Sequence, residues 1–296
     1  MLTFRSLLYL AICITASSCS LNKIFLHPNE LHTTDDFSTY VEEVDDTLTM
    51  TFTKNCDPIV LGSKGDVPEL SYDLESLFFE NSRGDSINAW LFTPRENYNG
   101  QTIYFLHGNA GHIVYQFNFA TPFVNAGYQV FMQDYSGFGF SGGKATRKQV
   151  YQDGQDGFEY LLSREDVKYD KLLIYGQSLG GHLAAVIGTD NQDKIDALVL
   201  EGAFSSHKDI AAVSVPVLGR IFTREIYSAE KSLPNFNKPL LLIHSTEDAT
   251  IPYSHVERLL EVANNPKELY TIDGKHIYGP ILYGDTIIEK MRALVN

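Results

Sequence analysis

The 296-residue sequence has few of the residues and patterns that mark metal, disulfide or nucleic-acid chemistry. It contains three cysteines and one tryptophan, and 23 lysines and arginines stand against 37 aspartates and glutamates. No Cys-x-x-Cys or His-Glu-x-x-His spacing occurs, so these motifs indicate no metal site. The formal net charge of −14 argues against the phosphate backbone of a nucleic acid as a partner.

Long hydrophobic runs are also scarce, and the N-terminal one, Leu7 to Ile14, is too short to span a bilayer. It is followed by small residues at 16–18 and then by Cys19, as at the end of a signal peptide. Small residues before a cysteine resemble a bacterial lipobox, with Ala16 where leucine or valine is more usual. The resemblance implies that residues 1–18 are removed and that the thiol of Cys19 is lipidated.

A chain processed in this way would be exported and anchored as a bacterial membrane lipoprotein facing the periplasm or the cell surface. It would touch the membrane only through the lipid on Cys19. The alternative is an ordinary secretory signal, cleaved nearby, that releases a soluble protein. In the lipidated chain Cys56 is the only free thiol, so we expect no intramolecular disulfide. Residues 19–40 are polar and are expected to form a tether.

Residues 41–296 have the length of one large α/β domain, and the sequence is 44% hydrophobic and 20% charged, as in an ordinary folded protein. We expect antiparallel strands at 75–80 and 87–92, and a loop at 56–70. Beyond them, apolar strands alternate with helices, which predicts a mostly parallel sheet with helices on both faces. The expected later strands are 102–106, 127–133, 172–175, 197–200, 240–244 and 268–272. The expected helices include 113–126, 151–162, 254–264 and 282–295. The stretch 205–237 is predicted to be a short cap of one or two helices.

The most informative stretch is 171–187, where an apolar strand runs into Gly-Gln-Ser-Leu-Gly and then into a buried helix. Strand, G-x-S-x-G and helix together are typical of a nucleophile elbow, which lifts the hydroxyl of Ser178 above the sheet. Glycines on both sides remove the Cβ atoms that would clash in so sharp a turn. The alternative is a glycine-rich turn in which Ser178 merely caps the helix.

A second loop that could take part in catalysis follows the strand 102–106, at His107–Gly111. Its small residues allow backbone N–H groups to point above the sheet, where an oxyanion develops in acyl transfer. We predict an oxyanion hole formed by the N–H groups of Leu179 and Asn109, with Ala110 as an alternative to Asn109. The imidazole of His107 is predicted to be structural.

Three groups stand just beyond the carboxyl ends of three predicted strands: Ser178, Asp248 and His276. A serine hydroxyl needs a base within hydrogen-bond reach, and the base needs a carboxylate that fixes its tautomer. Their order in the chain, Ser, Asp, His, is the order found in one hydrolase fold. Glu247 is the rival carboxylate, but its position one residue earlier should point it elsewhere.

Taken together, these motifs resemble the α/β-hydrolase superfamily, in particular its serine-aminopeptidase-like and small esterase-like members with a minimal cap. The resemblance covers about residues 75–295 and implies the α/β-hydrolase fold, the triad named above and no cofactor. Two departures are Ser136, where arginine is common, and Ser245, where glycine usually follows the strand histidine. The motifs that carry the resemblance are His107–Gly111, Asp134–Gly139, Gly176–Gly181, Ile243–His244, Asp248, Pro252, Gly274 and His276.

Three functions are then open. The first is an exported serine hydrolase that cleaves small carboxylic esters or thioesters through an acyl-enzyme. The second is a peptidase or amidase with the same triad, for which Glu201 is a candidate to bind a substrate ammonium group. The third is a non-catalytic surface lipoprotein that binds a ligand, because a fold alone does not determine function.

Overall fold

The computed structural model describes residues 25–41, 45–167 and 169–296. The predicted signal peptide and Cys19 lie outside these residues, as does the first part of the predicted tether. No helix in the described ranges is both long enough and apolar enough to cross a membrane.

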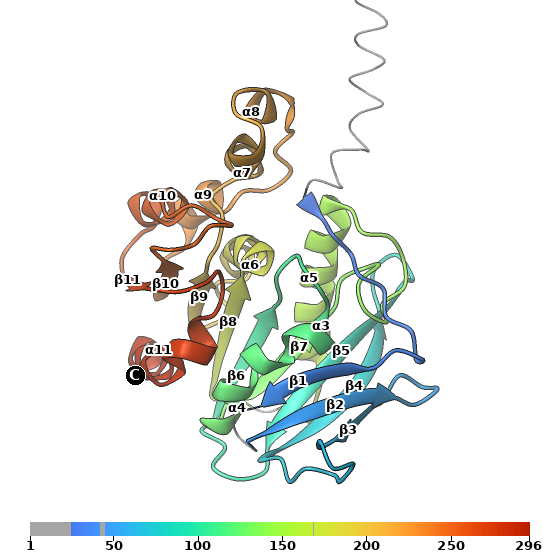
Figure 1. Ribbon diagram of the computed structural model, residues 1–296. Coiled ribbons are helices and arrows are strands. Elements are labelled where there is room, and N and C mark those ends of the chain that lie inside the picture. The colour runs from blue at the N-terminus through green and yellow to red at the C-terminus, as the bar shows by residue number, and fades with distance from the viewer. Residues whose placement is uncertain (1–24, 42–44, 168) are drawn as a thin grey trace, which may run out of the picture.

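A central sheet is built from eight strands, and its architecture confirms the predicted α/β fold (Figure 1). The strands are β4 (Tyr72–Glu80), β5 (Ser86–Pro94), β6 (Gln101–Leu106), β7 (Gln129–Gln133), β8 (Lys171–Gln177), β9 (Ala197–Glu201), β10 (Leu240–Ser245) and β11 (Lys267–Ile272). Their spatial order is β11-β10-β9-β8-β6-β7-β5-β4. Strands β6 to β11 pair in parallel, whereas β5 runs antiparallel to both β7 and β4.

Helices cover both faces of this sheet, and the sheet separates the core into two apolar clusters. Neighbouring strand residues point to opposite faces, so that Tyr104 joins one cluster and Phe105 the other. The first cluster packs under α5 (Arg147–Ser163), α6 (Leu179–Asp190) and α10 (Ser254–Val262). The second packs under α3 (Ile113–Gln116), α4 (Thr121–Asn125) and α11 (Gly279–Val295).

One predicted helix, 113–126, is broken into shorter pieces. The turns are α3, a 3-10 turn η2 (Phe117–Phe119) and α4. Pro122 lies in the first turn of α4, and because proline lacks an N–H and clashes with a preceding turn it favours a new helix start over a continuous one. Phe117, Phe119 and Phe123 of this stretch are buried in the second core cluster, whereas Tyr115 is 56% exposed.

A small second sheet lies at the N-terminal side of the domain. It contains β1 (Phe37–Val41), β2 (Asp46–Phe52) and β3 (Pro58–Leu61), paired antiparallel in that order. Alternate side chains of β2 are buried in the second core cluster. The prediction of a loop over 56–70 is therefore wrong at β3, where a short apolar stretch completes the sheet.

The described part of the predicted tether also lies against the domain. This segment, which begins at Phe25 and is called the N-terminal arm below, packs against the domain. Phe25 and Leu26 are buried in the first core cluster. The N–H of Leu31 donates to the carbonyl of Gly139. Polar composition predicted a tether, but backbone hydrogen bonds do not depend on side-chain polarity.

The cap is as short as the sequence indicates, but it has more pieces. It contains α7 (His207–Ser214), α8 (Leu218–Phe222), α9 (Ala229–Ser232) and a 3-10 turn η3 (Leu233–Asn235). Figure 1 shows α7 and α8 standing beyond α6 and α9, away from the sheet.

Candidate active site

Ser178 occupies the turn between β8 and α6. Its backbone has φ 55° and ψ −115°, a conformation that costs energy for any residue with a Cβ atom. The turn is held by the N–H of Ser178, which donates to the carbonyl of Glu201 at 2.8 Å. A Cβ added to Gly176 would lie 2.2 Å from the carbonyl oxygen of Gly180, so the turn cannot close around a larger residue. This is the sharp strand-to-helix elbow that the sequence indicates.

The structure brings together the three side chains that the sequence places on separate strands. The Oγ of Ser178 lies 2.8 Å from Nε2 of His276, and Nδ1 of His276 lies 2.6 Å from Oδ2 of Asp248. With the imidazole proton on Nδ1, His276 donates to the carboxylate and accepts from the hydroxyl. Asp248 follows β10 and His276 follows β11, so parallel strands deliver all three groups to one edge of the sheet.

The carboxyl group of Asp248 is held in its ionised form. Burial alone would raise its pKa, but the hydrogen bond and charge of His276 outweigh burial and hold the pKa below the usual value. The N–H groups of Thr250 and Ile251 assist, each donating to Oδ1 at 2.8 Å. A carboxylate with this many fixed donors can orient an imidazole and stabilise its cation.

The rival carboxylate points elsewhere. Glu247 is exposed and accepts the N–H of Gly274 at 3.0 Å. The neighbouring Ser245, one of the two departures from the family pattern, donates from Oγ to the carbonyl of Gly274 at 2.5 Å. Both side chains thus tie the loop after β10 to the loop that carries His276, a role that sequence analysis did not assign to either.

The predicted oxyanion loop lies directly beside Ser178. A Cβ added to Gly108 would be 3.4 Å from the Cβ of Ser178. Among the backbone hydrogen bonds of the described residues, none is donated by the N–H of Leu179, Asn109 or Ala110. Free N–H groups at these positions are compatible with the predicted oxyanion hole, and Ala110 stays an alternative to Asn109.

Several residues that sequence analysis did not single out brace this loop. Gln116 accepts the N–H of Gly108 at 3.0 Å and donates to the carbonyl of Ala110 at 2.7 Å. The side-chain Oδ1 of Asn109 accepts the N–H of His27 at 2.9 Å, so the N-terminal arm passes over the loop. Gln116 stood in a predicted helix without any motif, and only the fold reveals its contacts.

Two histidines of the loop are buried. The Nδ1 of His107 lies 2.7 Å from the carbonyl oxygen of Gly108, which fits its predicted structural role. His112, which follows the loop directly, is buried as well. It is 4% exposed and caps α3, where its ring accepts the N–H of Tyr115.

Glu201 is also buried, and its carboxylate is fully engaged. Oε2 accepts from the hydroxyl of Tyr175 and the amide of Gln177, each at 2.7 Å, and Oε1 accepts the N–H of Gly279 at 2.7 Å. The same amide of Gln177 donates to the carbonyl of Ile277 at 3.1 Å. Glu201 therefore supports the segment just after His276 from below and offers no free oxygen to a substrate ammonium group.

The fold and this constellation define an α/β hydrolase, and comparisons with known proteins agree. A family model described as "Serine aminopeptidase, S33" matches residues 99–228. The uncharacterised protein YfhR of Escherichia coli K12 is 34% identical over 228 residues, which cover 74% of this chain and 80% of that protein. The chain therefore belongs to the same family as YfhR, and its fold is that of the α/β hydrolases.

Two further proteins extend the comparison. The α/β hydrolase domain-containing protein WAV2 of Arabidopsis thaliana is 27% identical over 210 residues, 65% of this chain and 68% of that protein. The esterase Pf2001 of Pyrococcus furiosus superposes with a TM-score of 0.61 at 19% identity, covering 76% of this chain and 92% of that one. At this identity the solved structure supports the fold.

Proposed function

We propose that this chain is a serine hydrolase that cleaves carboxylic esters or thioesters through an acyl-enzyme. The observation that carries the proposal is the continuous hydrogen-bonded series from Ser178 through His276 to Asp248. His276 takes the hydroxyl proton as Oγ attacks the carbonyl carbon, and the cation that forms is stabilised by Asp248. The N–H groups of Leu179 and Asn109 stabilise the tetrahedral oxyanion.

His276 then returns the proton to the leaving alcohol or thiol as the acyl-enzyme forms. In the second half-reaction a water molecule gives its proton to His276 and attacks the acyl group, which regenerates Ser178. No cofactor is needed for either step, because the base, the acid and the oxyanion donors all come from the chain.

The test compares the wild-type chain with Ser178→Ala on p-nitrophenyl acetate and butyrate. We expect the substitution to remove nearly all turnover and to abolish labelling by a fluorophosphonate probe, because both require the Oγ atom. Equal rates would rule out the proposed mechanism. Complete absence of labelling of the folded wild-type chain would favour the non-catalytic alternative.

The peptidase alternative gains support from the description of the matching family model. Against an aminopeptidase stands the engaged state of Glu201, the one carboxylate that the sequence suggested for binding an ammonium group. Profiling aminoacyl-naphthylamides against acyl esters distinguishes the two. The short cap favours small or short-chain acyl groups, and a strong preference for long acyl chains would contradict this part of the proposal.

The location that we propose is a bacterial membrane, where the chain is anchored by lipid on Cys19 and faces the periplasm or the cell surface. The N-terminal sequence supports it, and so do exposed apolar side chains on the cap. Val217, Leu218, Ile221 and Phe222 are between 51% and 69% exposed, as is typical of surfaces that contact a partner or a membrane. Incorporation of a labelled fatty acid should be lost in Cys19→Ser and retained in Cys56→Ser. Equal labelling of both variants would contradict lipidation at Cys19.

A further inference from the structure

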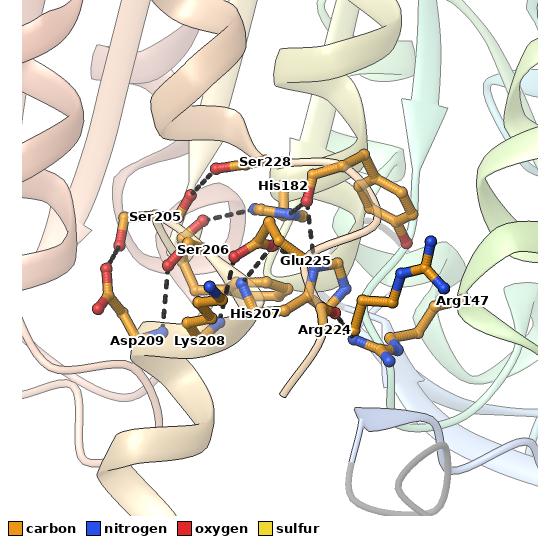
Figure 2. Close-up of polar contacts among 12 residues, drawn as sticks. Arg147, His182, Ser205, Ser206, His207, Lys208, Asp209, Arg224, Glu225 and Ser228 are labelled. Carbon is orange, nitrogen blue, oxygen red and sulfur yellow. Dashed lines mark hydrogen bonds and ion pairs between the residues drawn. The ribbon is translucent and has the colours of Figure 1, made fainter. Parts of the chain in front are cut away.

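Three side chains outside the proposed active site meet between the elbow helix and the cap. His182 lies on α6, His207 begins α7, and Glu225 lies between α8 and α9 (Figure 2). One possible ligand atom from each residue lies within 4.8 Å of the other two. Both imidazoles are fully buried.

The buried surroundings of both imidazoles disfavour their charged forms. Burial lowers the pKa of His182 to about 3, and the neighbouring His207 lowers it further. Burial also lowers the pKa of His207, where the charge of Arg147 assists and the hydrogen bond to Glu225 opposes the shift. A neutral imidazole carries a single N–H, so each ring has one lone pair available.

The contacts of His182 cannot all be satisfied by that single proton. Its Nδ1 lies 2.7 Å from the carbonyl oxygen of Phe204, and its Nε2 lies 3.4 Å from the carbonyl oxygen of Tyr227. The shorter contact takes the proton, which leaves a lone pair on Nε2 facing a carbonyl oxygen. Two buried acceptors that face each other without a proton are unfavourable, and a cation between them removes the conflict.

The remaining distances fit a metal ion at this point. Nδ1 of His207 lies 3.2 Å from the same carbonyl oxygen of Tyr227 and 2.9 Å from Oε1 of Glu225. Ligands at zinc-to-nitrogen or zinc-to-oxygen distances near 2.0–2.2 Å in a tetrahedron are about 3.4 Å apart. The three successive contacts among these four atoms, 2.9–3.4 Å, are equal to or shorter than that separation, and one ligand atom of each residue lies within 4.8 Å of the others, so the side chains need only adjust to enclose an ion.

We propose that His182, His207 and Glu225 bind Zn²⁺ through Nε2, Nδ1 and Oε1, and that the carbonyl oxygen of Tyr227 or a water molecule supplies the fourth ligand. The donor set of two imidazoles and a carboxylate suits zinc. Nδ1 of His207 would give up its proton to Nε2 of the same ring, which has no hydrogen-bond partner in the described chain.

The role of such an ion is structural. The N–H of His182 donates to the carbonyl of Ser178 at 3.0 Å, so the proposed ligand lies one helical turn after the nucleophile. The other two ligands belong to the cap. Zinc at this site would fix the cap to the elbow helix, and it takes no part in the proposed hydrolysis.

The site is tested with the full chain, carrying no histidine tag and stripped of metal by a chelator. Zinc is titrated in competition with a chromophoric chelator, and melting temperature is followed in parallel. We expect one zinc per chain and a melting temperature that rises with zinc concentration. Substitution by Co²⁺ should give the visible absorption of a tetrahedral site. Binding of clearly less than one zinc ion per chain, together with an unchanged melting temperature, would overturn the proposal.

Two variants separate a metal site from an ordinary polar cluster. Glu225→Gln keeps an oxygen that can accept from His207 but removes the charge, so the fold should persist while zinc affinity falls at least about tenfold. His32→Gln is the control, because His32 is exposed and distant in sequence from the cluster; it should bind zinc like the wild type. Equal affinity of Glu225→Gln and wild type, or an equal loss in His32→Gln, would contradict the assignment. Because binding is measured without a substrate, this result is independent of the proposed hydrolase activity.

Discussion

Single residues decide which carboxylate serves the histidine. Asp248 and Glu247 are neighbours in sequence, yet only Asp248 has its carboxylate within 2.6 Å of Nδ1 of His276. The difference arises because the chain turns immediately after β10, and two backbone N–H groups hold Asp248 toward the imidazole.

This geometry predicts unequal effects of two conservative substitutions. Asp248→Asn should lower kcat by about 10³–10⁴-fold, because an amide can stabilise the wrong tautomer of His276 and offers no charge to its cation. Glu247→Gln should leave kcat nearly unchanged, because its side chain only accepts the N–H of Gly274. Ester hydrolysis at saturating substrate measures both, and similar losses in the two variants would contradict the assignment of the acid.

Glu201 illustrates a residue whose burial makes stability depend on pH. Burial raises its pKa, and its hydrogen bonds from Gln177, Tyr175 and Gly279 only partly offset that effect. A carboxyl with a raised folded pKa contributes stability fully below its unfolded pKa, about 4.3 for glutamate, and loses it as pH rises through the folded pKa.

Comparison of the wild type with Glu201→Gln isolates the pH-dependent contribution of Glu201 to the free energy of unfolding, because glutamine does not titrate. The wild-type free energy of unfolding minus that of the variant should therefore decrease as the pH rises above about 4. Urea unfolding at several pH values provides the measurement. A difference that stays constant or increases would show that Glu201 does not have a raised pKa in the folded chain.

At the scale of elements, the elbow depends on close contact between the start of α6 and the end of β6. A Cβ added to Gly180 would lie 1.9 Å from the carbonyl oxygen of Leu106 and 2.6 Å from that of His107. Neither atom can move without displacing the predicted oxyanion loop. The glycines of the motif thus serve packing as well as the sharp turn.

Gly180→Ala should therefore destabilise the chain by about 3 kcal/mol or more, since overpacking against backbone is difficult to relieve. Gly188→Ala is the matched control on the same helix, where the nearest contact is a leucine methyl at 3.1 Å that can shift. The cost of this contact in Gly188→Ala should be offset by the gain of about 1 kcal/mol from the higher helix propensity of alanine. Denaturant unfolding decides, and equal stability of the two variants would contradict this account of the elbow.

The whole molecule combines a deeply buried core with a cap whose outer side is apolar and exposed. Leu218 on α8 is 54% exposed, whereas Leu233 in η3 at the base of the cap is fully buried in the first core cluster. Within the cap, one leucine therefore contributes to the core while another is largely exposed to solvent.

The two leucines predict a clear contrast in stability. Leu233→Ala should cost about 2–5 kcal/mol, because it leaves a cavity in the core. Leu218→Ser should change the free energy of unfolding by less than about 1 kcal/mol, because much of its side chain already lies in water. Thermal and urea unfolding of the full chain test both, and a large loss in Leu218→Ser would show that the cap is covered by another part of the protein.

Much of this arrangement was accessible from sequence, for a physical reason. Apolar strands alternating with helices can bury their faces only in a layered α/β fold, and the parallel strands then deliver Ser178, Asp248 and His276 to one edge. The elbow was visible because its glycines are dictated by local sterics. Such features depend on near neighbours in the chain or on a general rule of sheet topology.

Other features depend on contacts between distant segments, and these only the tertiary structure decided. The arm from Phe25 carries no motif, yet it lies over the predicted oxyanion loop. Glu201 is polar in sequence but becomes a buried support, because Tyr175, Gln177 and Gly279 surround it in space. His182 lies near His207 and Glu225 because the cap segment that carries these two residues packs against α6. Local sequence fixes periodicity and turn chemistry, whereas the partners of a side chain are set by which surfaces the folded chain brings together.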